Sequence, residues 1–262
     1  IFFLILYIKV LIIMVNSNFF DDNFIAFAHR GGNDFGPENS LKAFKGAYKS
    51  GYKYLETDIH LSKDGHLLAF HDDSIDRVTN NKGKIENLNL SEIKKSKIDG
   101  KEEIPVITDL FEELPNCFFS IDCKSDDTVL PLIKIIKDKS LMERICIGSF
   151  SQKRINLIRN ILGPNLKTSM GPNEIILSKL LSNFSINYKF KSNFASLPIE
   201  KYGLELLNEK NIKYLQKNNQ KVIAWTINDE NDMRLLIRRG IDGIMTDNIL
   251  LLKRVLIEEN LW

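Results

Sequence analysis

The sequence predicts a (β/α)₈ barrel, an α/β fold in which parallel strands alternate with helices. Short apolar runs with strand character recur eight times, and amphipathic helical patterns lie between most of them. The chain has 262 residues, 44% of them hydrophobic, which suits one large α/β domain. Eight strands with helices between them, in about 250 residues, are typical of this barrel.

Each predicted strand is a short apolar run bounded by polar or turn-forming residues. The predicted strands cover residues 25–28, 54–60, 117–123, 145–148, 167–170, 194–197, 222–225 and 243–246.

Each predicted helix has apolar residues at helical spacing. In the segment 40–50, Leu41, Phe44, Ala47 and Tyr48 fall on one face. The other predicted helices lie near residues 108–114, 128–139, 152–161, 173–181, 208–218 and 229–238.

The connection over residues 61–107 is too long for a simple strand–helix loop. Residues 67–70 predict a short extra strand after the Asp64-Gly65 turn, and the remainder indicates a small surface insertion. An insertion after a barrel strand lies over the carboxyl end of the barrel, where substrates bind. With no internal repeat or linker, residues 24–262 are predicted to form a single domain.

The charge balance gives no support for a nucleic-acid-binding face or a polybasic membrane patch. Lys and Arg number 36 against 34 Asp and Glu, a net charge of +2. The three cysteines, Cys117, Cys123 and Cys146, lack metal-ligand spacing, so buried free thiols are predicted. A reducing compartment, the cytoplasm, is therefore expected.

Residues 1–23 are predicted to be an extension outside the domain. Residues 1–15 are almost wholly apolar, interrupted by Lys9. A membrane-spanning helix needs about 20 such residues, and a signal peptide would add a basic leader and a small-residue cleavage site. We therefore expect residues 1–13 to lie upstream of a natural start at Met14, without stable membrane insertion. A membrane anchor or an export signal is the alternative.

Polar residues gather where the predicted strands end, which in a barrel is one mouth. They are His29, Arg30, Glu56, Asp58, Asp122, Lys124, Ser149, Trp225 and Asp247.

Glu56 and Asp58 alternate on one strand, so their side chains project from the same face. Two adjacent carboxylates repel each other, and a cation between them lets both stay ionised. Mg²⁺ or Ca²⁺, which prefer oxygen ligands, fit this requirement. The histidines His29 and His71 could transfer protons near neutral pH.

In the order and spacing of these histidines and carboxylates, the chain resembles the glycerophosphodiester phosphodiesterase family. It is similar in length to the compact cytosolic members of that family. The resemblance spans roughly residues 24–252. It is carried by the motifs Ala28-His29-Arg30-Gly31-Gly32, Pro37-Glu38-Asn39-Ser40, Glu56-Thr57-Asp58, Lys63-Asp64-Gly65, His71-Asp72-Asp73, Ala224-Trp225-Thr226-Ile227-Asn228 and Gly240-Ile241-Asp242-Gly243-Ile244-Met245-Thr246-Asp247.

The resemblance implies a TIM barrel that uses one divalent metal ion to hydrolyse glycerophosphodiesters to glycerol 3-phosphate and an alcohol. It assigns roles residue by residue: His29 and His71 as the acid/base pair, Glu56, Asp58 and Asp122 as metal ligands, Arg30 and Lys124 as phosphate ligands, and Trp225 as a wall of the glycerol pocket. The family most often has Glu-Ile-Lys where this chain has Asp122-Cys123-Lys124, so the third carboxylate is one methylene shorter.

Several alternatives stay open at this stage. The substrate could be a lysophospholipid or another lipid phosphodiester, which a wide apolar groove beside Trp225 would favour over a tight polar pocket. The barrel could also bind glycerophosphodiesters without cleaving them. The nucleophile could be water or the glycerol 2-hydroxyl, and either histidine could be the base. Gly31 and Gly32 could serve a turn or an approach to phosphate, whereas His60 and His66 are predicted at the surface.

Overall fold

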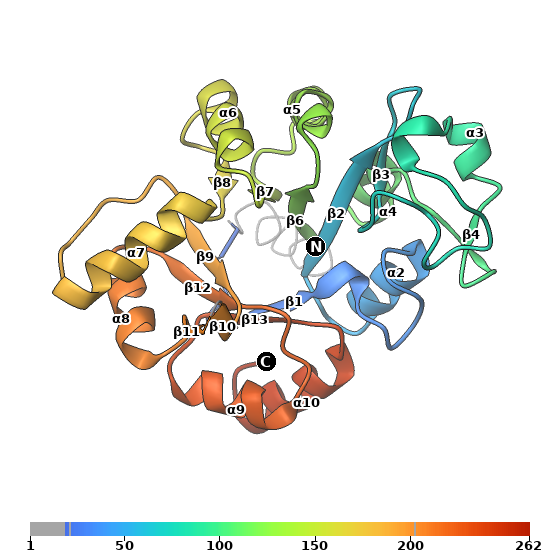
Figure 1. The fold of residues 1–262 in the computed structure, drawn as a ribbon. Coiled ribbons are helices and arrows are strands. Elements are labelled where there is room, and N and C mark those ends of the chain that lie inside the picture. Colours follow the sequence, from blue (N-terminus) through green and yellow to red (C-terminus); the bar gives the residue numbers. More distant parts are fainter. Residues whose placement is uncertain (1–18, 21, 202) are drawn as a thin grey trace, which may run out of the picture.

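The computed structural model describes residues 19–262 except 21 and 202, so residues 1–18 of the predicted extension 1–23 lie outside the described residues. Within them, eight parallel strands form a barrel in the order β8-β7-β6-β2-β1-β13-β12-β9. A parallel bridge between Ser169 and Phe194 joins the two ends of this series. The predicted (β/α)₈ barrel is confirmed (Figure 1).

The barrel strands lie close to their predicted positions. They are β1 (Ile25–Ala28), β2 (Tyr54–Leu61), β6 (Phe118–Cys123), β7 (Ile145–Gly148), β8 (Lys167–Thr168), β9 (Phe194–Leu197), β12 (Lys221–Ala224) and β13 (Gly243–Thr246).

Helices surround the barrel on the outside (Figure 1). They are α2 (Leu41–Lys49), α4 (Ile107–Glu113), α5 (Val129–Asp138), α6 (Gln152–Leu162), α7 (Pro172–Phe184), α8 (Glu209–Lys217), α9 (Glu230–Arg238) and α10 (Ile249–Glu258). The last of these, α10, was not predicted, although its buried residues Ile249, Leu252, Val255 and Leu256 have helical spacing.

Polar side chains fix the starts of several helices. The Ser40 hydroxyl accepts a hydrogen bond from the Ala43 amide at the start of α2, and Asp229 accepts from Asn231 and Asp232 at the start of α9. These bonds satisfy amides that the helix itself leaves without partners.

The segment between β2 and α4 forms a small layer with its own core. It contains β3 (Leu67–Ala69), η2 (Ile85–Asn87), α3 (Leu90–Ile93), β4 (Lys97–Ile98) and β5 (Glu102–Glu103). The predicted extra strand is β3, which pairs antiparallel with β2. Apolar side chains including Leu68, Phe70 and Ile93 pack together beneath this layer. It therefore extends the barrel mouth beside β2 (Figure 1).

The two ends of the barrel interior differ. Phe19, Phe27, Tyr54 and Phe118 fill one end, and the Tyr54 and Phe118 rings are stacked with centroids 5.2 Å apart. The other end, where the strands terminate, carries the polar residues. Among the described helices, none combines the length and apolar character needed to cross a membrane.

Candidate active site

His29 begins η1 (His29–Gly31), the turn that follows β1. This turn needs left-handed backbone: φ is 50° at Arg30, 87° at Gly31 and 75° at Gly32. A Cβ on Gly31 would lie 3.0 Å from the Phe44 amide nitrogen, and one on Gly32 would lie 2.7 Å from Ile249. Both glycines are thus explained by the turn and by close packing against α2 and α10.

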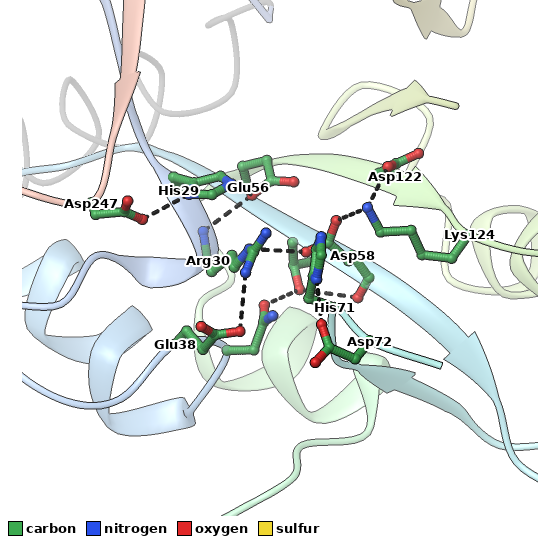
Figure 2. Close-up of polar contacts among 12 residues, drawn as sticks. His29, Arg30, Glu38, Glu56, Asp58, His71, Asp72, Asp122, Lys124 and Asp247 are labelled. Atoms are coloured by element: carbon green, nitrogen blue, oxygen red, sulfur yellow. Dashed lines mark hydrogen bonds and ion pairs between the residues drawn. The ribbon is translucent and has the colours of Figure 1, made fainter. Parts of the chain in front are cut away.

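The His29 imidazole lies between two carboxylates (Figure 2). Its Nδ1 is 2.7 Å from Asp247 Oδ1, and its Nε2 is 3.9 Å from Glu56 Oε2. Asp247 is held in turn by the Asn228 side-chain amide at 2.8 Å. Burial alone would lower the pKa of His29, but the Glu56 charge and the Asp247 hydrogen bond outweigh it and raise the pKa above its ordinary value. The sequence places Asp247 at the barrel mouth, and the structure adds its hydrogen bond to His29.

Glu56 and Asp58 are buried, with 6% and 3% of their surfaces exposed. Burial and the neighbouring Asp58 charge raise the pKa of Glu56 to about 7. The Arg30 backbone amide donates to Glu56 Oε2 at 3.1 Å, so the turn after β1 is tied to β2. The pair is therefore adjacent, as the alternation along β2 predicts.

Lys124 joins two of the predicted metal carboxylates. Its ammonium nitrogen lies 2.6 Å from Asp58 Oδ1 and 2.8 Å from Asp122 Oδ2 (Figure 2). Asp58 and Asp122 are register partners on β2 and β6, which explains their proximity. Burial raises the pKa of Asp122. Burial alone would lower the pKa of Lys124, but the two carboxylates reverse the direction and raise it.

The Arg30 guanidinium is held by carboxylates. Its Nη1 donates to Glu38 Oε1 at 3.0 Å, and its Nε lies 3.3 Å from Asp58 Oδ2. Glu38 also accepts two hydrogen bonds from Arg77. Arg30 and Lys124 therefore lie where an anion could be bound, but each is paired with acidic side chains.

His71 comes from the loop after β3. Its Nδ1 is 2.6 Å from Asp72 Oδ1, and Asp72 accepts hydrogen bonds from Nε and Nη2 of Arg77. The Arg77 hydrogen bond is the main reason that the pKa of Asp72 falls to about 2. The expectation that His60 is a surface residue was wrong, because its half-buried ring hydrogen-bonds to the His71 carbonyl at 3.0 Å.

A single cavity of about 690 Å³ contains every predicted site residue. These residues are His29, Arg30, Glu56, Asp58, His71, Asp122, Lys124 and Trp225. The same cavity also has an extensive apolar wall, which includes Phe150, Met170, Ile175, Ile176, Leu180 and Leu204. Sequence reasoning missed this wall. Phe150 and Met170 had a signal, since Phe150 follows the end of β7 and Met170 ends the predicted strand over residues 167–170.

The prediction of a divalent cation can be compared with the side chains that could coordinate it. In the described part of the chain, no three His, Cys, Asp or Glu side chains are grouped so that they could hold a metal ion. Lys124 lies between Asp58 and Asp122 instead. Yet Asp58 Oδ2 and Asp122 Oδ1 are buried and accept no hydrogen bond from any described residue. Buried carboxylate oxygens that accept no hydrogen bond suit a hard cation chemically, provided that it displaces Lys124 and competes with Arg30 Nε, which lies 3.3 Å from Asp58 Oδ2.

Known proteins share this sequence pattern and fold. The profile of the "Glycerophosphoryl diester phosphodiesterase family" matches residues 29–161 and 132–251. The chain is 32% identical over 239 residues to the glycerophosphodiester phosphodiesterase of Caldanaerobacter subterraneus, covering 86% of this chain and 94% of the relative. It is 28% identical to the "Probable glycerophosphodiester phosphodiesterase 2" of Mycobacterium tuberculosis, covering 91% and 92% of the two chains.

Among solved structures, an Oleispira antarctica phosphodiesterase in complex with the product sn-glycerol-3-phosphate has a TM-score of 0.73, with 20% identity and coverage of 89% of this chain and 96% of that one. This likeness supports the fold. The profile match extends over most of the barrel, including the strand ends that carry the charged residues. The chain therefore belongs to the glycerophosphoryl diester phosphodiesterase family, and it is a phosphoric diester hydrolase.

Proposed function

We propose that this protein hydrolyses glycerophosphodiesters to glycerol 3-phosphate and an alcohol, with His29 and His71 as the acid/base pair and one Mg²⁺ or Ca²⁺ as cofactor. One observation carries the proposal: both imidazoles, the three carboxylates and two cations line one cavity. The family resemblance supplies the substrate class. A barrel that only binds the diester would not require two imidazoles, each held by its own carboxylate.

The residues can divide the chemistry between them. A water molecule or the glycerol 2-hydroxyl attacks phosphorus while one histidine takes its proton. The phosphorus–oxygen bond to the alcohol then breaks, and the other histidine protonates the departing oxygen. Attack by water gives glycerol 3-phosphate directly, whereas attack by the 2-hydroxyl gives a cyclic phosphate that a water molecule must then open. General acid–base assistance of this kind contributes about 10²–10⁴ in rate. Asp247 and Asp72 hold the Nδ1 atoms, which leaves each Nε2 available for proton transfer.

Glu56, Asp58 and Asp122 would hold the cation, whose charge would offset that of the phosphodiester and polarise a phosphoryl oxygen. Lys124 pairs with Asp58 and Asp122 here, and it would be freed if these carboxylates held the cation. Together with Arg30 it could then pair with the phosphate. The pairing of Lys124 supports this exchange, because a positive charge already lies between two of the carboxylates that would hold the cation.

The test is a panel of glycerophosphodiesters assayed by release of glycerol 3-phosphate. We expect turnover that stops after treatment with EDTA and returns with Mg²⁺ or Ca²⁺. Full activity after exhaustive chelation would refute the metal requirement. Absence of glycerol 3-phosphate with every substrate would refute the activity. A small-molecule substrate, without nucleic acid, and a cytoplasmic location stay predictions.

A further inference from the structure

Unlike His29, the histidine His71 does not follow a strand of the barrel. It comes from the loop after β3, in the segment between β2 and α4, and its side chain is 35% exposed. A group that transfers a proton must be positioned accurately, and a residue on a loop needs contacts of its own for this. The residues that hold the His71 ring therefore matter for the reaction.

Asp72 orients the His71 ring, and Arg77 orients Asp72. The His71 Nδ1 atom lies 2.6 Å from Asp72 Oδ1. The Arg77 guanidinium donates twice to the same carboxylate, from Nε to Oδ2 at 2.6 Å and from Nη2 to Oδ1 at 3.1 Å. Two hydrogen bonds from a planar guanidinium fix the plane of a carboxylate. An aspartate is ionised at neutral pH without such help, so Arg77 contributes orientation.

The same guanidinium also binds the carboxylate that holds Arg30. Arg77 donates from Nη1 to Glu38 Oε2 at 3.0 Å and from Nη2 to Glu38 Oε1 at 2.6 Å. Glu38 Oε1 accepts a further hydrogen bond from Arg30 Nη1 at 3.0 Å. Figure 2 shows Glu38 beside Arg30 and Asp72 beside His71. Arg77 therefore connects the two sides of the site through one carboxylate on each side.

The contact with Arg77 also weakens the hold of Glu38 on Arg30. Glu38 Oε1 accepts from both arginines, so its charge is shared between them. Without Arg77, Glu38 would pair with Arg30 alone, and the Arg30 guanidinium would be less available to a phosphate. Loss of Arg77 should therefore weaken substrate binding as well as displace the His71 ring.

Attachment of the small layer to the barrel does not depend on Arg77. Strand β3 pairs antiparallel with β2, and the layer has its own apolar core, which includes Leu68, Phe70 and Ile93. The Arg77 side chain is 48% exposed, and ion pairs between partly exposed side chains contribute little to stability. The four hydrogen bonds of Arg77 are thus better explained by the orientation of its two carboxylates.

The other histidine has a corresponding arrangement within the barrel. Asp247 holds the His29 Nδ1 atom, and the Asn228 side-chain amide, from the loop after β12, donates to Asp247 at 2.8 Å. Each imidazole is therefore held by a carboxylate that a further side chain fixes in place. For His71 that further side chain is Arg77, which the small layer supplies.

We propose that Arg77 is a positioning residue of this enzyme. It holds Asp72 and Glu38 so that the His71 ring and the Arg30 guanidinium face the phosphodiester at the same time. Arg77 is absent from the described residues that line the active-site cavity, and it lines instead a second cavity of about 500 Å³ together with Glu38. The inference rests on the proposed function, which takes His71 as a proton-transfer group and Arg30 as a phosphate ligand.

The first experiment measures kcat and KM for glycerophosphocholine in Arg77→Met. We expect kcat to fall about 10–100-fold and KM to rise, because both His71 and Arg30 lose support. Arg77→Lys should recover only part of the loss, since an ammonium cannot bind two carboxylates as a planar fork does. Values of kcat and KM in Arg77→Met equal to those of the wild type would overturn the inference.

The matched control is Lys42→Met, which removes another ion pair between the barrel and the small layer. Lys42 of α2 lies 3.8 Å from Glu102 of β5, and neither residue lines the active-site cavity. Its kcat and KM should equal those of the wild type. The midpoints of thermal unfolding of Lys42→Met and Arg77→Met should both stay within about 4 °C of the wild type.

A double-mutant cycle tests whether Arg77 acts through Asp72. Asp72→Asn and Arg77→Met should each lower kcat, and kcat of the double variant should lie within about threefold of the slower single variant, because residues that act as a unit are not additive. If Arg77 only supported the fold, the two reductions would multiply. Reductions that multiply would therefore overturn the inference.

A measurement without turnover separates failure of this inference from failure of the proposed function. Nitrogen-15 NMR of the neutral His71 ring in EDTA-treated protein, assigned by the signals lost in His71→Ala, reports which ring nitrogen carries the proton. We expect the proton on Nδ1 in the wild type and in Lys42→Met. Arg77→Met should show a mixture of tautomers, because the Nδ1 proton then lacks a fixed acceptor.

The NMR outcome is decisive whether or not a substrate is hydrolysed. A single, unchanged tautomer of His71 in Arg77→Met would overturn the inference and leave the proposed function standing. A mixture of tautomers in Arg77→Met, in a protein that hydrolyses no glycerophosphodiester, would support the positioning role of Arg77 and refute only the proposed function.

Discussion

The two halves of the cavity are built on different parts of the fold. Apart from His71, which comes from the loop after β3, the charged half sits on the ends of β1, β2 and β6, strands that are hydrogen-bonded neighbours in the barrel. Register pairing there fixes positions closely, and it places Asp58 opposite Asp122. The apolar half sits on loops, on the hairpin of β10 (Glu200–Lys201) and β11 (Leu204–Glu205) and on α7, which lie outside the barrel strands.

This difference indicates how the two halves respond to sequence change. Side chains that act on the phosphorus atom must be positioned accurately, because a small displacement lowers the reaction rate strongly. Residues on strands are held more rigidly than residues on loops and so provide this accuracy. A wall that contacts a substrate through apolar side chains needs only apolar area, which helices and loops can supply with varied residues. We therefore expect the charged half to set the rate and the apolar half to set the choice of substrate.

The largest expected effect is in the charged half. His29→Ala and His71→Ala should each lower kcat by about 10²–10⁴, since each removes one proton-transfer group. The matched control is His66→Ala, because the His66 side chain is 44% exposed and paired with Asp64 away from the cavity. Steady-state kinetics and thermal unfolding of the three variants check this. Near-normal turnover in either site variant would remove that histidine from the mechanism.

A smaller effect is expected at the residue that positions His29. Asp247→Asn keeps the side-chain shape but removes the charge that helps to raise the pKa of His29. The pKa of His29 should fall, and kcat should drop by about 10–100-fold. NMR titration of the imidazole in chelator-treated protein measures the pKa without interference from a metal. An unchanged pKa would mean that Asp247 acts only through the fold.

Glu56 offers a test through stability. Between the ordinary Glu pKa of about 4.3 and its raised pKa of about 7, the folded metal-free protein retains a proton that the unfolded chain has released. Stability therefore falls as the pH rises through this window, and the loss is complete above it. Glu56→Gln lacks this ionisation, so it should be more stable than the wild type at pH above 7, by about 1–3 kcal/mol.

Denaturant unfolding in EDTA at two pH values measures this difference, with the exposed Glu86→Gln as the matched control. Added Mg²⁺ or Ca²⁺ should stabilise the wild type but not Glu56→Gln, because a ligand that binds the folded state stabilises it. Equal stabilisation of both proteins would place the cation elsewhere.

The charged half could be predicted from the sequence for a physical reason. Strand ends are visible as the limits of apolar runs, and in a parallel barrel they all meet at one mouth, so His29, Glu56, Asp58 and Asp122 could be grouped without coordinates. The side chains that hydrogen-bond to these site residues and orient them could not be predicted. The Asp247–His29 pair joins residues 218 positions apart, and the Arg77–Glu38 pair joins residues 39 apart. Such pairings depend on loop conformation, which periodicity does not encode.

The apolar half of the cavity could not be predicted from the sequence, for a different reason. In α7, apolar residues at 175, 177 and 181 and at 176, 180 and 184 lie on both sides of the helix, so spacing alone does not say which set faces the barrel. The position of the helix could be predicted, but the observed helix, Pro172–Phe184, ends three residues beyond the predicted range 173–181. Its exposed apolar stripe, Ile176, Leu180 and Phe184, became apparent only when Ser178 and Ser182 were found buried.

The smallest expected effect distinguishes a substrate-binding wall from a structural core. Leu180→Gln should change the free energy of unfolding by no more than about 0.5 kcal/mol, because glutamine and leucine have similar helix propensities and Leu180 is 56% exposed. Leu132→Ala, at a fully buried leucine of α5, should lose about 2–5 kcal/mol. Denaturant unfolding of both variants without lipid provides the comparison. A loss at Leu180 comparable to that at Leu132 would show that the stripe supports the fold itself, and the apolar half would then have no surface left over for a substrate.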